Sequence, residues 1–288
     1  MRKKIKRVSV LVNPAKTGVS RLVAEIREEF SLRGIDAVWH RDRKINYGGA
    51  QRLASLAREE DQLVMVIGGD GTLLQAARRL QGMPIPLLGI NAGSLGFLTS
   101  LSGEQVLQQI NRVLDGDYQL DRRACLECDH RRGNRILKSH WAMNEVAITR
   151  GAHSHLIRVD LKIGDEVATS YACDGLIMAT PTGSTAYSVA AGGPILSPRA
   201  KVFVVTPICA HSLTNRPLVV GEEEEVQFVV PDKGALLRVN VDGVPGGMMA
   251  AGDRLVFRRA RHGVMLAHLP EGTFYSILKQ KLHWSGAV

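Results

Sequence analysis

The chain has 288 residues, of which 45% are hydrophobic and 23% are charged, and this predicts a globular protein with room for two domains. No apolar run approaches the ~20 residues that cross a bilayer, and the basic start MRKKIKRVSVLVNP lacks the apolar core of a signal peptide. We therefore expect a cytoplasmic protein with no membrane partner. The formal charge of +9 is scattered and only 5% of residues are aromatic, which argues against nucleic acid as a partner.

The first 120 residues alternate short apolar runs with helical patterns. Strands are expected at 8–14, 36–40, 63–67 and 85–90, and helices at 19–34, 48–59, 72–82 and 103–116. This alternation predicts a Rossmann-like α/β domain over 1–120, with a parallel sheet between helices. Ligands of such sheets bind beyond the carboxyl ends of strands, where GGDGT (68–72) and NAGSLGF (91–97) lie.

After about Tyr118 the segments become short, β-branched and separated by turn residues. The stretch 125–141 reads as strand, turn, strand, and further strands are expected at 140–151, 156–166, 175–183, 200–208, 225–234, 236–243 and 254–260. This pattern predicts an antiparallel β-sandwich domain over 121–264. The last stretch, FYSILKQKLHW (274–284), predicts a helix that returns to the first domain within 265–288.

Cys125 and Cys128 form one C-x-x-C pair, which is half of a zinc site, and no second pair follows. His130 and His140 could complete a ligand set. Residues 125 and 128 of one strand face opposite sides of a sheet, however, so we favour a structural role for these cysteines. The four thiols of a cytoplasmic chain are expected to be reduced.

Asp70 stands where glycines usually cradle a phosphate, between a buried strand and the start of a helix. A carboxylate beside a phosphate is tolerated when a divalent cation lies between them, or when the acid takes the proton of an attacking hydroxyl. We interpret Asp70 as a partner of the nucleophile and the glycine N–H groups as partners of phosphates. The chain has neither G-x-x-x-x-G-K-[ST] nor G-x-G-x-x-G, so a P-loop kinase is excluded.

Two segments of the second half combine polar residues with open backbone. In PTGSTAYS (181–188), followed by GGP (192–194), small side chains would let a flat ligand approach main-chain groups. Asp174 precedes this segment and could accept a hydrogen bond from an exocyclic amine. Asn144 and Glu145 interrupt an apolar strand in succession, so one of the two side chains points into the core or a cleft.

Five motifs occur in this chain in the order found in the NAD kinases: GGDGT, NE, DGLIMATPTGSTAYSVAAGGPILSP, TPICAHSLTNRPLV and VNVDG. The chain resembles the bacterial-type ATP/polyphosphate-NAD kinases from about Val8 to Ala260. The resemblance implies transfer of a phosphoryl group from ATP, or from polyphosphate, to the 2′-hydroxyl of the adenosine ribose of NAD, which gives NADP. It also implies a homodimer or homotetramer, and Mg²⁺ that travels with the triphosphate near Asp70 instead of occupying a dedicated cage.

By this resemblance Asp70 is the catalytic proton acceptor. The implied NAD-binding residues are Asp70, Gly71, Leu74, Phe97, Asn144, Glu145, His155, Ala172, Asp174, Thr182, Thr185, Ala186, Tyr187, Ser188, Val189, Ala190 and Asp242. Asn144 and Glu145 would hold ribose hydroxyls and adenine edges, Asp174 would bind the adenine amine, and Asp242 would approach the dinucleotide from the last strands. Ala172 stands where some bacterial members have arginine, which leaves the preference between NAD and NADH open.

Two alternatives stay open at the level of sequence. A diacylglycerol-type lipid kinase would share VNPAKTG and GGDGT, although the hydroxyl-rich loop favours a polar nucleotide over acyl chains. A catalytically idle dinucleotide sensor would keep the same binding residues. The sequence also leaves open the choice between ATP and polyphosphate, the oligomeric state, and any feedback by NADP or NADPH.

Overall fold

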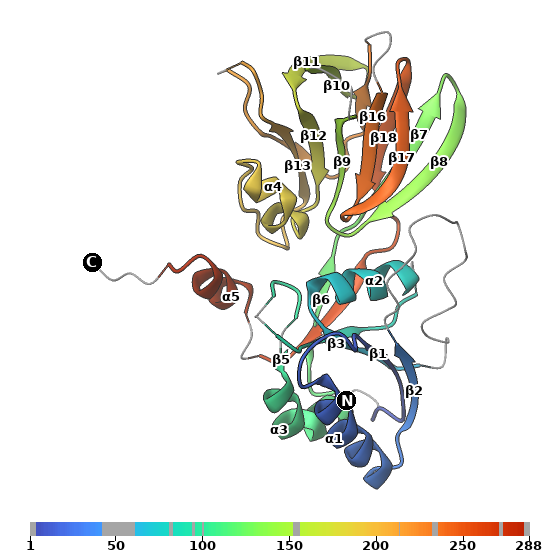
Figure 1. Cartoon of the computed structure of the whole chain (residues 1–288), viewed down its shortest axis with the longest axis vertical. Helices are drawn as coiled ribbons and strands as arrows, with labels where there is room; N and C mark the ends of the chain where they lie inside the picture. The colour runs from blue at the N-terminus through green and yellow to red at the C-terminus, as the bar shows by residue number, and fades with distance from the viewer. Residues whose placement is uncertain are drawn as a thin grey trace. The chain divides into compact units, whose positions relative to one another are not determined.

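The computed structural model describes residues 4–41, 61–80, 83–93, 96–99, 101–151, 156–212, 214–231, 236–270 and 273–284. Met1–Arg122 and Val264–Val288 form one compact unit, and Arg123–Gly263 form a second one (Figure 1). The helix expected at 48–59 lies outside the described residues.

The first unit is built on one sheet, sheet A. Its strands are β1 (Arg7–Val12), β2 (Asp36–Arg41), β3 (Leu63–Gly68), β4 (Leu87–Asn91), β5 (Leu101–Ser102), β6 (Gln119–Arg123) and β19 (Val264–His268). Their order is β2-β1-β3-β4-β19-β6, with β5 beside β4. The ladders that join β1, β2, β3, β4, β5 and β19 are all parallel. The carboxyl ends of β1, β3 and β4 therefore lie at one edge of the sheet.

Three helices cover sheet A: α1 (Val19–Leu32), α2 (Asp70–Leu80) and α3 (Gly103–Leu114). Figure 1 shows α1 and α3 on one face of the sheet and α2 on the other. Ile26 and Phe30 of α1 and Ile110 of α3 belong to one apolar cluster with the sheet residues beneath them. β3 is buried along its whole length, as a strand covered on both faces requires. The predicted parallel α/β fold is confirmed.

The second unit is a sandwich of two antiparallel sheets. Sheet B has the order β11-β10-β15-β18-β7-β8, and sheet C has the order β14-β13-β12-β9-β16-β17. The strands are β7 (Leu126–Arg132), β8 (Arg135–Ala142), β9 (Glu145–Arg150), β10 (Ile157–Ile163), β11 (Glu166–Cys173), β12 (Gly175–Ala179), β13 (Val202–Ile208), β14 (Leu218–Gly221), β15 (Val226–Val229), β16 (Leu236–Val241), β17 (Val244–Ala250) and β18 (Asp253–Arg259). One buried cluster joins Phe228 and Phe257 of sheet B to Phe203 of sheet C, which confirms the predicted β-sandwich.

A compact segment covers the outer face of sheet C. It contains a 3₁₀ turn (Gly183–Thr185) and α4 (Tyr187–Ala190). After α4, Ala191 and Leu196 pack on Ile177 and Val204, which point away from the sandwich core. The strand expected at 175–183 thus ends at Ala179, and the hydroxyl-rich residues that follow belong to this cover.

The chain returns to the first unit through a strand that the sequence reading does not include. β19 pairs in parallel with β4, with Leu266 opposite Leu87. The expected terminal helix follows it as α5 (Phe274–Lys281), and the Thr273 hydroxyl caps this helix by accepting from the Ser276 N–H.

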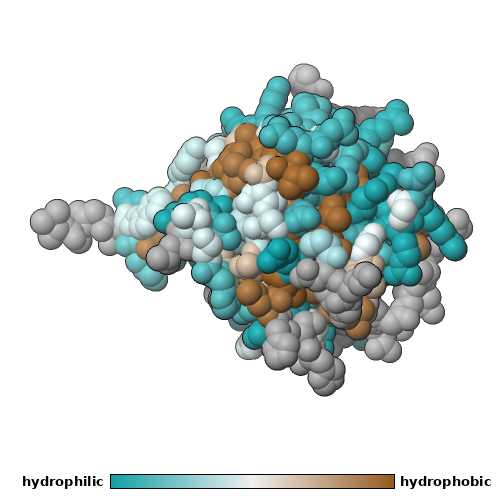
Figure 2. Space-filling view, turned by 90° about the horizontal axis from the view of Figure 1, so that it is seen from above, coloured by the Kyte–Doolittle hydropathy of each residue, from teal (hydrophilic) through white to brown (hydrophobic). Residues whose placement is uncertain are grey.

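The surface combines many charged residues with scattered apolar ones. Figure 2 shows hydrophilic residues (teal) around smaller hydrophobic areas (brown). Within the part of the chain that the structure describes, every helix is too short or too polar to span a membrane.

In sheet B a buried carboxylate, that of Asp253, connects the start of β18 to the end of the neighbouring strand β7. Asp253 has no exposed surface, and it accepts hydrogen bonds from Arg132 Nε (2.6 Å), His130 Nε2 (2.9 Å) and the Ala250 N–H (2.9 Å). Burial alone would raise the pKa of this carboxyl, but the hydrogen bonds from Arg132, Ala250 and His130 outweigh it and lower the pKa to about 2.

We expect Asp253→Asn to lower the free energy of unfolding by about 2–4 kcal/mol at pH 7, because it leaves buried donors without their charged acceptor. The carboxyl has a lower pKa in the folded chain than in the unfolded chain. Its contribution is therefore present above about pH 4 and is lost as the pH falls toward 2. Urea unfolding should show that the difference in the free energy of unfolding between variant and wild type is smaller at pH 3 than at pH 7. Asp165→Asn, at an exposed turn, should leave stability unchanged.

Candidate active site

Asp70 begins α2 at the carboxyl edge of sheet A, directly after β3. Its carboxylate accepts two backbone hydrogen bonds from the loop after β4: Oδ2 from the Phe97 N–H at 2.8 Å and Oδ1 from the Leu98 N–H at 3.1 Å. Each oxygen keeps a second lone pair for another partner. The carboxylate is thus fixed in orientation and still able to accept a proton.

Gly96 makes this contact possible, because a side chain there would occupy the place of the carboxylate. A Cβ atom on Gly96 would lie 1.9 Å from Asp70 Oδ1 and 2.5 Å from Cγ. Gly96 belongs to the segment NAGSLGF (91–97), but its sequence gives no sign of this contact. Glycine at this position is therefore a condition for the seating of Asp70.

A third loop joins the same edge, after β1. Asn13 Nδ2 donates to Thr72 Oγ1 at 3.2 Å, and the Asn13 N–H donates to the Ile67 carbonyl at 2.9 Å. In the same loop Lys16 is exposed, and its Nζ lies 3.8 Å from the position of a Cβ on Gly93. The loops after β1, β3 and β4 therefore meet around Asp70 and bring one lysine to this edge.

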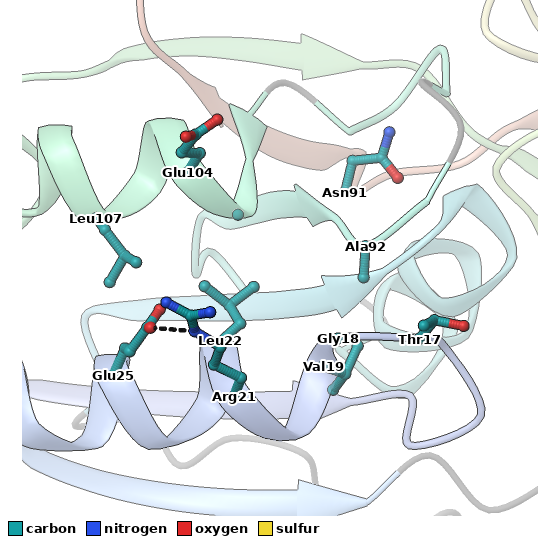
Figure 3. A pocket seen from close by; sticks show the side chains of 11 residues that line it. Thr17, Gly18, Val19, Arg21, Leu22, Glu25, Asn91, Ala92, Glu104 and Leu107 are labelled. Carbon is teal, nitrogen blue, oxygen red and sulfur yellow. Dashed lines mark hydrogen bonds and ion pairs between the residues drawn. The ribbon is translucent and has the colours of Figure 1, made fainter.

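A cavity of about 400 Å³ lies beside these loops within the first unit (Figure 3). Thr17 and Gly18 border it at the start of α1, Asn91 and Ala92 at the end of β4, and Leu107 on α3. An ion pair between Arg21 and Glu25 also lines it, with Nε and Oε1 2.8 Å apart. Its wall is thus partly apolar and partly charged, and Asn91 is shared with the loop that holds Asp70.

Asn144 and Glu145 lie at the start of β9 in the second unit. Both are almost buried, at 8% and 6% exposed. Among the described residues Asn144 Oδ1 and Glu145 Oε2 have no hydrogen-bond partner. Buried polar atoms are nearly always satisfied, so these two atoms mark a place that a polar ligand would complete. The sequence pattern led us to expect burial of one of the two side chains, and the structure buries both.

The Glu145 carboxyl is shifted toward its neutral form. Burial and, to a smaller extent, the negative charge of Asp242 raise its pKa to about 8, against an opposing hydrogen bond from the Tyr187 N–H. At neutral pH this side chain is therefore mainly a carboxylic acid, which can donate a hydrogen bond as well as accept one.

The segment after β12 uses its hydroxyl groups inside the protein. Thr180 Oγ1 donates to the Met143 carbonyl at 2.7 Å, Ser184 Oγ donates to Pro181 O at 2.7 Å, and Ser188 Oγ pairs with Thr206 Oγ1 at 2.8 Å. A Cβ on Gly183 would lie 2.1 Å from the Asn144 carbonyl oxygen. This segment is therefore packed directly against Asn144. Thr180, which the sequence reading passed over, makes the closest link.

The remaining candidates in the segment after β12 differ in exposure. Tyr187 starts α4 and is 42% exposed, and its neighbours Ala186, Val189 and Ala190 are also accessible. The remaining members of this segment differ in burial: Thr182 is buried and accepts from Arg123 Nη1 at 3.5 Å, whereas Thr185 is half-buried.

Asp174 lies next to the other end of the β9–β12 ladder, and Ala172 precedes it in β11. Ala179 is opposite Glu145, whereas Gly175, next to Asp174, is opposite Thr149. Four residues of strand separate these ends by about 13 Å. Asp174 lies 3.7 Å from Arg150 Nε, and the Ala172 carbonyl accepts from the His211 N–H.

The other predicted binding residues lie in both units, except His155, which the structure does not describe. Gly71, Leu74 and Phe97 belong to the first unit with Asp70; Gly71 is exposed, and Leu74 and Phe97 are half-buried. His155 lies outside the described residues. Asp242 is buried at a turn after β16, where it contacts residues 143–145.

Three of the four cysteines are buried, and the acidic run 222–225 is only partly exposed. Cys125, Cys128, Cys173 and Cys209 are free thiols, and burial raises the pKa of Cys128 well above its ordinary value. Burial, Lys138 and His130 lower the pKa of His140 to about 4, so its imidazole is neutral. In this run Glu222 is buried, and its Oε2 lies 3.1 Å from Arg259 Nε.

An α/β unit that seats one carboxylate among glycine-rich loops, joined to a β-sandwich unit with unsatisfied buried acceptors, defines a phosphotransferase outside the P-loop lineage. The model of the ATP-NAD kinase N-terminal domain matches residues 36–118, and that of the ATP-NAD kinase C-terminal domain matches residues 143–269. The chain belongs to the NAD kinase family, and this replaces the lipid-kinase alternative.

Similar proteins cover almost the whole chain. A NAD kinase of Koribacter versatilis is 37% identical over 282 residues, which are 97% of this chain and 99% of that protein. A NAD kinase of Heliobacterium modesticaldum is 42% identical over 76% of this chain and 78% of its own length. The structure of yeast NADH kinase with NADH has a TM-score of 0.85 at 22% identity, over 100% of this chain and 90% of that one. An Archaeoglobus fulgidus NAD kinase with ATP has a TM-score of 0.74, also at 22% identity, over 97% and 100%.

Proposed function

We propose that this protein is a NAD kinase that moves a phosphoryl group from ATP, or from polyphosphate, to the 2′-hydroxyl of the adenosine ribose of NAD. The observation that carries the proposal is the seat of Asp70, whose carboxylate is oriented by the Phe97 and Leu98 N–H groups at the ligand edge of sheet A. Family membership and relatives named NAD kinase support the substrate.

In this mechanism Asp70 accepts the proton of the ribose hydroxyl while the hydroxyl oxygen attacks the terminal phosphorus. The bond from that phosphorus to its bridging oxygen breaks, and the remainder of the donor leaves. Asn144 and Glu145 supply the unsatisfied polar atoms that hold the nucleoside. Positioning and charge stabilisation supply most of the catalysis in phosphoryl transfer.

The side chains near Asp70 suit a divalent cation that arrives bound to the triphosphate, because Asp70 offers carboxylate oxygens to such an ion. Among the described residues no group of three or more His, Cys, Asp and Glu side chains could hold a metal ion. Asp70 would be the residue that touches the ion, through the lone pairs left free by Phe97 and Leu98. Mg²⁺ suits this arrangement, because it is bound by one or two carboxylates with phosphate oxygens and water, and it would neutralise the phosphate charge.

The test is a product assay with the purified chain, Mg²⁺ and four pairings of NAD or NADH with ATP or polyphosphate. A dehydrogenase specific for the 2′-phosphorylated coenzyme detects the product. We expect product in at least one pairing and its loss when the metal is chelated. Absence of product in all four pairings would contradict the proposal, and sedimentation equilibrium of the same sample would test the expected homodimer or homotetramer.

A further inference from the structure

Asp242 lies at a tight hairpin turn that brings it back to the start of β9. Asp242 and Gly243 join β16 to β17 with φ angles of 46° and 74°, and Val241 pairs with Val244. Two left-handed residues of this kind form a type I′ turn, for which Asp-Gly is a favoured sequence. The Asp242 N–H donates to the Glu145 carbonyl at 2.9 Å, so the turn is attached to the candidate site.

The Asp242 carboxylate accepts three hydrogen bonds from backbone N–H groups. Oδ1 accepts from the Asn144 N–H at 2.8 Å and from the Glu145 N–H at 3.0 Å, and Oδ2 accepts from the Met143 N–H at 3.0 Å. The residue is only 9% exposed. The resemblance implies that Asp242 approaches the dinucleotide directly. A carboxylate with three N–H donors and little exposure is instead suited to hold the protein backbone.

Two residues together satisfy the whole backbone of 143–145. The three N–H groups go to the Asp242 carboxylate, and the Glu145 carbonyl accepts from the Asp242 N–H. The Met143 and Asn144 carbonyls accept from Thr180, through its hydroxyl at 2.7 Å and its N–H at 2.9 Å. With the backbone fixed in this way, the side-chain atoms Asn144 Oδ1 and Glu145 Oε2 are the polar groups left for a ligand.

We propose that Asp242 is a positioning residue: by gathering the N–H groups of residues 143–145 and placing a negative charge behind Glu145, it sets Asn144 and makes Glu145 a hydrogen-bond donor to the nucleoside. This inference rests on the proposed function, because it concerns how the same site holds NAD. It assigns to Asp242 a role that acts through its two neighbours.

The charge around Glu145 supports the second half of this proposal. Burial and the Asp242 charge raise the pKa of Glu145 to about 8, against one opposing hydrogen bond from the Tyr187 N–H. A neutral Glu145 donates its proton to a ligand oxygen or nitrogen, and the ability is lost when it ionises. NAD affinity should therefore decline as the pH rises through about 8.

The test is the pH dependence of NAD binding, measured by calorimetry without donor, for wild type, Asp242→Asn and Glu145→Gln. Asp242→Asn removes the charge and turns one acceptor into a donor, so we expect about ten-fold weaker binding at pH 7 and a decline that starts at lower pH. Glu145→Gln keeps a neutral donor and should bind NAD with little dependence on pH between 6 and 9. Asp253→Asn, which disturbs a comparable buried carboxylate on sheet B, is the control, and its pH profile should match the wild type.

Each outcome decides the inference. A wild-type affinity that is flat across pH 8, or an Asp242→Asn profile with the wild-type midpoint, overturns it. Amide hydrogen exchange of residues 143–145 in the wild type and Asp242→Asn is read without NAD and should show faster exchange in the variant. If the wild type binds no NAD, the proposed function fails, and unchanged exchange in the variant would separately refute the anchoring role.

Discussion

Asp70→Asn should lower kcat by about 10²–10⁴-fold while the protein still binds NAD, because the amide cannot accept the hydroxyl proton. The asparagine is nearly the same size, so the loops around it stay in place. One of its two terminal atoms can still accept from the Phe97 or Leu98 N–H, whereas the other becomes a donor facing a donor. The loss should therefore fall on turnover, with a change of a few-fold in the KM for NAD.

Steady-state kinetics with NAD as the varied substrate, together with calorimetric NAD binding, measure the two effects separately. Asp36→Asn is the matched control in the same unit, because its side chain is 66% exposed and makes a single long ion pair with Arg7. It should retain wild-type kinetics. If the turnover of Asp70→Asn stays within ten-fold of the wild type, Asp70 takes no part in the chemistry. If the wild type itself shows no turnover, the idle-sensor alternative is favoured.

The sequence is informative about Asp70 because the signal there is local. A buried apolar run, a glycine pair, an acid and a helical pattern follow one another within residues 63–80, and together they predict a strand, a ligand loop and a helix. The structure has β3 and α2 at these positions, with Asp70 as the first residue of the helix. The parallel order of the strands then places the loop at the ligand edge.

The role of Asp242 could not be read from the sequence in the same way. Its carboxylate accepts from Met143, Asn144 and Glu145, which precede it in the chain by 97–99 positions. The pairing of β16 with β9 brings these residues together. The Asp242-Gly243 pair predicts a turn, but a turn residue does not reveal which backbone its carboxylate meets. The same limit applies to the hydroxyl of Ser184, which belongs to the segment expected to meet a ligand and is bonded inside the protein.

Two of the strands that the sequence pattern does not predict, β17 and β19, share a physical cause. β17, VPGGMMA, has two glycines and few β-branched residues, so its intrinsic preference for a strand is low, yet it pairs with β16 along the sheet edge. β19 is five residues long and is separated from its partner β4 by more than 170 positions. Tertiary pairing decides both strands, and local patterns do not contain it.

Gly96→Ala should lower kcat by at least about 10²-fold while the fold persists and Asp70 itself is retained. The new Cβ would lie 1.9 Å from Asp70 Oδ1, so the carboxylate must rotate away from the Phe97 and Leu98 N–H groups. The atoms displaced are the end of one side chain and not backbone, so we expect a loss of stability of only about 1–2 kcal/mol. The measurements are kcat, the KM for NAD and the thermal unfolding midpoint.

Gly93→Ala is the matched control, because it adds the same methyl group to the same loop at a point where the nearest atom is the flexible Lys16 Nζ at 3.8 Å. Its kinetics should stay within about three-fold of the wild type. The comparison separates the presence of the acid from its orientation: Asp70→Asn removes the acid, and Gly96→Ala keeps it but turns it. If Gly96→Ala retains full turnover, the hydrogen bonds from Phe97 and Leu98 do not orient a catalytic group. If Gly93→Ala is equally impaired, the loop as a whole is sensitive, and the effect at Gly96 cannot be assigned to Asp70.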